Sequence, residues 1–123
     1  MLLHKDLDVY KKSVEMVVEV YGLTAKFPKE EMFGLVSQIR RSATSVPSNI
    51  AEGSARNSAK DYVRFLYIAL GSAAELETQL LIASRLNFIQ QADYEIFSQK
   101  INTISKMLQG LIRHNKKKSY PKK

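Results

Sequence analysis

The chain has 123 residues, a length that fits one domain with a sizeable hydrophobic core. Hydrophobic residues make up 45% and charged residues 25%, which is the balance of an ordinary globular protein. The absence of cysteine excludes a disulfide framework and a thiolate metal site, and it fits a reducing cytoplasm. No run without a formal charge exceeds ten residues, whereas a bilayer-spanning helix needs roughly 20. We therefore expect a cytoplasmic protein with no membrane partner.

The net charge of +7 is unevenly distributed along the chain. The last eleven residues carry six positive charges and no acid: Arg113, Lys116, Lys117, Lys118, Lys122 and Lys123. The rest has 13 basic and 12 acidic residues, a charge of only +1. We expect a domain over residues 1–114 followed by a flexible basic tail over 115–123. Such a tail is typical of contact with a polyanion, often nucleic acid, although a solvated terminus would have the same composition.

Four segments place apolar residues at alternating steps of three and four, the pattern of helices packed in a left-handed bundle. In chain order they are Leu3, Leu7, Tyr10, Val14, Val17, Tyr21; Met32, Val36, Ile39, Ala43, Val46, Ile50; Tyr62, Phe65, Leu66, Ala69, Ala73, Leu76, Leu80, Ala83; and Tyr94, Phe97, Ile101, Ile104, Leu108, Leu111. Breaks fall at Phe27-Pro28-Lys29, at 53–57, where Ser58 offers an N-cap, and at 86–91. The prediction is an all-α, antiparallel up-down-up-down four-helix bundle. Its second helix should bend near Pro47, which lacks a backbone donor.

Two helices carry a second apolar stripe beside the first. In the first helix it comprises Val9, Met16, Val20, Leu23 and Phe27; in the third helix it comprises Val63, Tyr67, Leu70, Ala74 and Leu81. A helix that is apolar on most sides is buried on most sides, and an uncovered patch of this size marks an interface. We expect self-association, with Val63, Tyr67, Leu70 and Ala74 at the interface. A wide stripe facing the bundle's own core is the alternative.

Hydrogen-bonding residues lie beside the apolar seam of the second helix. Arg41, Ser45, Ser48 and Glu52 are spaced four, three and four apart, with Asn49 next to them, and the third helix offers Ser72, Glu75 and Gln79 in line. Half-buried polar groups must pair, and arginine suits bidentate contact with a carboxylate. We expect a structural network of Arg41, Asn49, Glu52 and Glu75. In it, Arg41 would bind Glu75 or Glu77, within or between subunits, and fix the register of the helices.

No pattern in the sequence supports catalysis or a cofactor. The two histidines, His4 and His114, lie near the ends, and neither follows a glutamate by three residues as a bundle-core di-iron site requires. No nucleophile elbow occurs, and no internal histidine is present to act as base. The turn at 53–58 could hold a phosphate at a helix N-terminus with help from Arg56, Lys60 and Arg64, although such a stretch is commonly only a turn. No aromatic–basic stacking platform is visible in the sequence.

Several motifs together resemble one family. They are Phe27-Pro28-Lys29-Glu30-Glu31; Leu35; Gln38-Ile39-Arg40-Arg41; Asn49-Ile50-Ala51-Glu52-Gly53; and Ala69-x-Gly71-Ser72-x-x-Glu75-Leu76-Glu77. The chain resembles, from about Leu7 to Ile112, the four-helix-bundle family named for proteins encoded in intervening sequences of 23S ribosomal RNA genes. The accessory proteins of diversity-generating retroelements look like relatives of that family. The resemblance implies a bacterial protein without enzymatic activity that associates with nucleic acid. It also implies assembly into a ring, which we expect to be a pentamer.

These observations lead to two competing functions. The first is a non-enzymatic oligomer, without metal or cofactor, that contacts nucleic-acid phosphates, RNA or DNA, through Arg40, Arg56, Lys60 and the basic residues from Arg113 onward. The second is a protein–protein adaptor or scaffold whose basic tail is incidental. The salt dependence of nucleic-acid binding separates the two.

Overall fold

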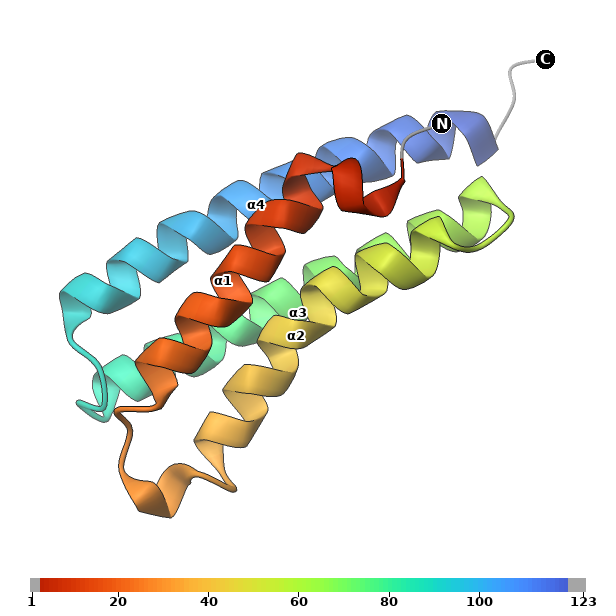
Figure 1. Cartoon of the computed structure of the whole chain (residues 1–123). Helices are drawn as coiled ribbons and strands as arrows, with labels where there is room; N and C mark the ends of the chain where they lie inside the picture. Colours follow the sequence, from red (N-terminus) through yellow and green to blue (C-terminus); the bar gives the residue numbers. More distant parts are fainter. Residues whose placement is uncertain (1–2, 120–123) are drawn as a thin grey trace.

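The computed structural model describes residues 3–119, and within them the chain is helical without any strand. Four long helices follow one another: α1 (Asp8–Thr24), α2 (Leu35–Ser54), α3 (Ala59–Arg85) and α4 (Gln91–Ser119). Two short 3₁₀ turns, η1 (His4–Asp6) and η2 (Lys29–Glu31), precede α1 and α2. Consecutive helices run antiparallel and lie side by side (Figure 1). The predicted all-α four-helix bundle is confirmed.

The helices begin and end for local chemical reasons. The Ser58 side chain accepts a hydrogen bond from the Asp61 backbone N–H at 3.0 Å, which caps α3 as the sequence predicted. At its other end, Asn87 takes the left-handed conformation with φ 64°, and the Phe88 N–H donates to the Ala83 carbonyl at 2.9 Å. This closure satisfies a terminal carbonyl and turns the chain back into α4.

Helix α2 continues through Pro47 without a break. Proline has no N–H to donate to the carbonyl four residues earlier, so the helix loses one internal bond at Ala43. Figure 1 shows α2 changing direction along its course, as a proline inside a helix predicts. The Pro47 ring itself is buried, so the bend lies against the core and not in solvent.

The centre of the core comes from α2 and α3, whose predicted seams are confirmed except at Met32, which precedes α2 and is 41% exposed. Its fully buried side chains include Val36, Ile39, Ala43, Val46, Ile50, Leu66, Ala69, Ala73, Leu76, Leu80 and Ala83. Helix α4 adds Phe97, Ile101, Ile104 and Leu108 from its predicted seam, and it ends with Ile112 buried in place of the predicted Leu111, which is half-buried. A seam shared by three helices fixes their facing sides, and it orients the side chains described below.

For α1 the predicted inward face is wrong. Val9, Met16 and Val20, which the sequence assigned to a second stripe, are buried, whereas Val14 and Tyr21 from the predicted seam are exposed. The buried face also carries two hydroxyl residues, Ser13 and Thr24, so its apolar pattern looks interrupted in the sequence. Each hydroxyl donates to a carbonyl of its own helix at 2.8 Å, so burying it costs little free energy.

Helix α3 is apolar beyond what its own bundle buries. It is the one helix of the described chain whose length and composition would allow a membrane span, and only 33% of its most apolar window is buried. Ile68, Ile82 and Leu86 are 45%, 44% and 53% exposed. Core helices of water-soluble bundles pass the same test, and Glu75 and Glu77 interrupt the middle of α3.

Candidate nucleic-acid interface

Basic residues from two distant parts of the chain meet at one end of the bundle. The α2–α3 turn and the first turns of α3 supply Arg56, Lys60 and Arg64, and the last turns of α4 lie beside them (Figure 1). The contact is direct, because Lys116 Nζ lies 5.2 Å from the centre of the Tyr67 ring. We define the basic end as Arg56, Lys60, Arg64, Arg113, Lys116, Lys117 and Lys118.

The C-terminal lysines of the basic end lie on a helix. Helix α4 runs to Ser119, beyond the expected start of the tail at residue 115. Ile112 and Asn115 are buried, and the Asn115 side chain donates to the Leu111 carbonyl at 2.8 Å, so packing extends the helix past the last predicted seam position. Lys122 and Lys123, which the sequence also assigned to nucleic-acid binding, lie outside the described residues.

Few acids offset the charge of the basic end. Glu52 pairs with Arg56 at 3.8 Å, and Asp61 pairs with Arg64 at 3.9 Å. Both pairs are exposed and join residues three or four apart in the chain, and such pairs are weak and yield to a stronger anion. Within the described side chains, Lys60, Arg113, Lys117 and Lys118 form no ion pair. The end therefore presents a surplus of positive charge that phosphate could neutralise.

Aromatic rings lie among these cations, a feature that the sequence analysis missed. The Arg56 and Arg64 guanidinium carbons lie 5.0 and 4.9 Å from the centre of the Phe65 ring. Tyr67 lies two residues further along α3, about half a turn away, and sits beneath Lys116. The spacing of aromatic and basic residues within α3 could have suggested the Phe65 cluster. The Tyr67 contact needs the packing of α4, which no local pattern reveals.

Arg40 lies away from the basic end and is engaged in the fold. Its Nε donates to the Thr24 hydroxyl at 2.9 Å and its Nη2 donates to the Tyr21 carbonyl at 3.4 Å. The guanidinium also stacks 4.4 Å from the centre of the Tyr21 ring. A cation at the C-terminal turn of a helix is stabilised by the helix dipole. The structure thus gives Arg40 a contact that joins α1 to α2, and it does not bring Arg40 together with the other predicted basic residues.

The polar contact between α2 and α3 differs from the predicted one. The Ser45 and Ser72 hydroxyls lie 2.8 Å apart, and the Asn49 side-chain amide donates to the Ser45 hydroxyl at 2.9 Å. Arg41 donates instead to Ser37 at 3.4 Å on its own helix, and Glu75 is exposed. Within residues 3–119 no ion pair joins Arg41 to a carboxylate.

The intrachain Arg41–Glu75 link is therefore wrong, as is the alternative within the chain to Glu77. The reason is geometric: small hydroxyl side chains fit between two closely packed helices, whereas a long guanidinium turns outward. Glu52 and Glu77 are used elsewhere, Glu52 by Arg56 and Glu77 as acceptor for the Ser98 hydroxyl at 2.5 Å.

Two of the residues expected at an oligomer interface pack inside the subunit. Val63 and Leu70 are half-buried against the bundle's own core, whereas Tyr67 and Ala74 are exposed. Leu70 and Ala74 line one wall of a groove of about 420 Å³ between α3 and α4. This groove begins next to the basic end.

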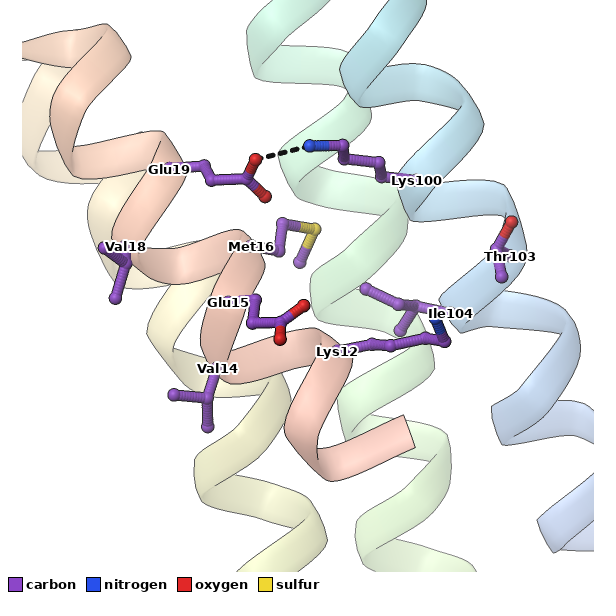
Figure 2. Close-up of a pocket in the computed structure, with 9 residues that line it drawn as sticks. All are labelled: Lys12, Val14, Glu15, Met16, Val18, Glu19, Lys100, Thr103 and Ile104. Carbon is purple, nitrogen blue, oxygen red and sulfur yellow. Dashed lines mark hydrogen bonds and ion pairs between the residues drawn. The ribbon is translucent and has the colours of Figure 1, made fainter. Parts of the chain in front are cut away.

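A second groove, of about 570 Å³, separates α1 from α4. Met16 and Ile104 lie inside it, and Figure 2 shows Glu19 joined to Lys100 across its rim. Charges of both signs alternate around this rim, with Lys12 and Glu15 beside the ion pair, so it favours no anion. Among the described residues no group of three or more His, Asp or Glu side chains could hold a metal ion.

The comparisons with known proteins agree with the fold and the sequence motifs. The profile of the 23S rRNA-intervening sequence proteins matches residues 5–110. The chain is also similar to a solved structure from Bacteroides thetaiotaomicron, a protein of unknown function from the S23 ribosomal protein family. The two share 33% identity with a TM-score of 0.79, and the match covers 85% of this chain and 95% of that one. No curated protein matches.

Proposed function

This chain belongs to the family of 23S rRNA-intervening sequence proteins, and on that premise we propose that it is a non-enzymatic homo-oligomer that binds nucleic-acid phosphates through its basic end. One observation carries the proposal: two segments far apart in the sequence bring seven cations to one end of the bundle. Phosphate contacts of this kind supply most of the affinity in sequence-independent binding. The family name points to RNA as the first polymer to test.

Self-assembly is the second part of the proposal. The outer face of α3 leaves Ile68, Ile82 and Leu86 exposed, and Val18 of α1 is 67% exposed. Water-soluble monomers rarely leave an apolar face of this kind uncovered. We propose that the protein forms a closed pentameric ring. Several basic ends of one ring can then contact the same polymer, and each contact raises the effective concentration of the polymer at the other basic ends. Light scattering should give a multiple of the 14.0 kDa chain mass.

The test of nucleic-acid binding removes charge without removing helix. In one variant Lys116, Lys117 and Lys118 are replaced by Gln. A matched control replaces Lys26, Lys29 and Arg85 by Gln; these exposed residues lie toward the opposite end, and the formal charge falls by the same amount. Fluorescence anisotropy with labelled RNA and DNA is then measured over a range of salt concentrations.

We expect the first variant to bind more weakly and its plot of log K against log salt to flatten by about 2 to 3 units per contacting subunit, because each lost phosphate contact removes roughly 0.7–0.9. The control should keep a slope close to that of the unmodified protein. Equal losses in both variants would show that net charge alone attracts the polymer, and the basic end would then have no special role. Absence of binding by the unmodified protein would favour the adaptor hypothesis.

The cellular setting completes the proposal. We place the protein in the bacterial cytoplasm, where its polymer partners are. Its relation to the accessory proteins of diversity-generating retroelements rests on the motifs quoted above. The neighbouring genes test that relation: a reverse transcriptase gene beside this one would support it, and a position inside a ribosomal RNA operon would favour the other branch of the family.

A further inference from the structure

The groove between α3 and α4 opens beside the basic end. Its α3 wall offers Leu70 and Ala74, and its α4 wall offers Asn102, Ser105 and Gln109. Its volume of about 420 Å³ lies in the range of sites that hold small organic groups. Tyr67 lies one turn from Leu70 on the side of the basic end, so an aromatic ring stands at the entrance.

The Tyr67 ring is partly exposed and lies beneath one cation. It is 46% exposed, and Lys116 of α4 lies over it. Arg64 precedes it by one turn on α3, and Arg113 precedes Lys116 by one turn on α4. An exposed aromatic face beside positive charges is the arrangement on which proteins stack the bases of single strands.

The walls of the groove change in character with distance from Tyr67. Along α4, Asn102, Ser105 and Gln109 recur at steps of three and four and lead directly to Arg113. These amides and hydroxyls can donate and accept hydrogen bonds but carry no charge. At the far end Ser98 donates to the Glu77 carboxylate, which repels phosphate. The charges thus favour phosphates at the entrance and uncharged, hydrogen-bonding groups inside.

We propose that this groove binds single-stranded nucleic acid, with one base stacked on Tyr67. Arg64, Arg113 and Lys116 would hold the adjoining phosphates. The neighbouring base would lie over Leu70 and Ala74, within reach of Gln109. The inference rests on the proposed function and narrows it from nucleic acid in general to single strands.

A duplex or a second protein subunit fits these features less well. The faces of paired bases are stacked inside a duplex and cannot reach Tyr67. A protein interface over the same residues would desolvate Arg113, which forms no ion pair within residues 3–119, and a buried charge without a partner is costly. A polyanion neutralises this charge instead. Self-assembly then uses other exposed apolar residues, among them Val18, Ile82 and Leu86.

The chain contains no tryptophan, so one introduced tryptophan reports from a single place. The test variant is Tyr67→Trp. Its matched control is Tyr21→Trp, since Tyr21 is 43% exposed and also lies beneath a cation, Arg40, but away from the basic end. Each variant is titrated with oligo(dT), with oligo(U) of equal length and with a DNA duplex, and its fluorescence is recorded.

We expect oligo(dT) and oligo(U) to quench Tyr67→Trp, the duplex to quench it little, and none of the three to quench Tyr21→Trp. The stronger quencher of the two shows which of these single strands the groove prefers. Equal quenching of Tyr67→Trp and Tyr21→Trp, or stronger quenching by the duplex, would overturn the inference.

A second measurement separates stacking from charge. Tyr67→Leu should weaken single-strand binding by about 5- to 150-fold, the loss of one base–aromatic stack, and leave the salt slope unchanged. Tyr67→Phe should bind normally. If Tyr67→Leu changes the assembled mass and not single-strand binding, Tyr67 is a self-association residue and the inference is wrong. If binding depends on salt but is unchanged in Tyr67→Leu, the inference is wrong and the proposed function still holds. If the unmodified protein binds no nucleic acid, both the inference and the proposed function are wrong.

Discussion

Two helices approach each other closely at Gly53, where the end of α2 meets the start of α3. A Cβ atom at position 53 would lie 2.8 Å from Phe65 Cβ, 2.9 Å from Tyr62 Cδ1 and 3.3 Å from the Tyr62 carbonyl oxygen. Phe65 Cβ is attached to the α3 backbone and cannot rotate away, so relief requires α3 itself to move. We predict that Gly53→Ala destabilises the bundle.

The magnitude follows from two opposing effects. Alanine in a helix gains up to about 1 kcal/mol over glycine, less near a helix end. Adding a methyl group to a tightly packed site costs about 1–3 kcal/mol. The clash should win and lower the free energy of unfolding by about 1–2 kcal/mol. The same substitution at Gly71, within α3, meets nothing within 4 Å and should raise it by about 0.5–1 kcal/mol.

Urea unfolding followed by circular dichroism at 222 nm measures both changes. Each protein is unfolded at several concentrations, because self-association would otherwise add to the apparent stability. Opposite signs for Gly53→Ala and Gly71→Ala are the expected result. If Gly53→Ala stabilises the protein as much as Gly71→Ala does, the two helices do not approach as closely as described and the reasoning fails.

Two further predictions concern the core. Leu76 is fully buried at the centre of α3, so Leu76→Ala should lower the free energy of unfolding by about 2–5 kcal/mol, and an unchanged urea midpoint would contradict its placement. Burial raises the pKa of Tyr62 above its ordinary value, so its neutral form adds stability that is fully present below about pH 10 and is lost as the pH rises through the folded-state pKa. Relative to Tyr62→Phe, the unmodified protein should lose stability above that pH; parallel stabilities of the two up to pH 11 would refute this.

The sequence was sufficient for the fold and for three of the four buried faces. In α2 and α4 one apolar stripe clearly outweighs the rest of the helix, so the inward side can be assigned from periodicity alone. Helix α3 also carries a second stripe, but the stripe chosen as its seam is the buried one. Helix α1 carries two stripes of similar strength. Periodicity does not choose between them, and the buried stripe also contains Ser13 and Thr24, whose hydroxyls donate to carbonyls of their own helix. The inward face of α1 was therefore predicted wrongly.

The sequence likewise predicted only part of the candidate site. Arg56 and the basic residues of α4 could be named from charge alone, but their meeting depends on the antiparallel packing of α3 and α4. Arg40 was predicted to bind nucleic acid because of its charge, but its side chain donates hydrogen bonds to the C-terminal end of α1. The Ser45–Ser72 contact was missed because a serine pair carries no signal stronger than that of any surface serine. Long-range packing, not composition, decides these cases.

Arg40 and Lys116 make similar cation–ring contacts but have different roles in the fold. Each places a cation over a tyrosine ring, Tyr21 in one case and Tyr67 in the other. At Tyr21 the guanidinium of Arg40 also donates hydrogen bonds to a hydroxyl and a carbonyl of α1. If Arg40 bound a phosphate instead, these contacts between two helices would be lost. At the basic end Arg56 and Arg64 are exposed, and their acidic partners Glu52 and Asp61 are weakly bound surface residues. A polyanion can therefore exchange with those partners at low cost, which is the physical reason to expect binding at the basic end and not at Arg40.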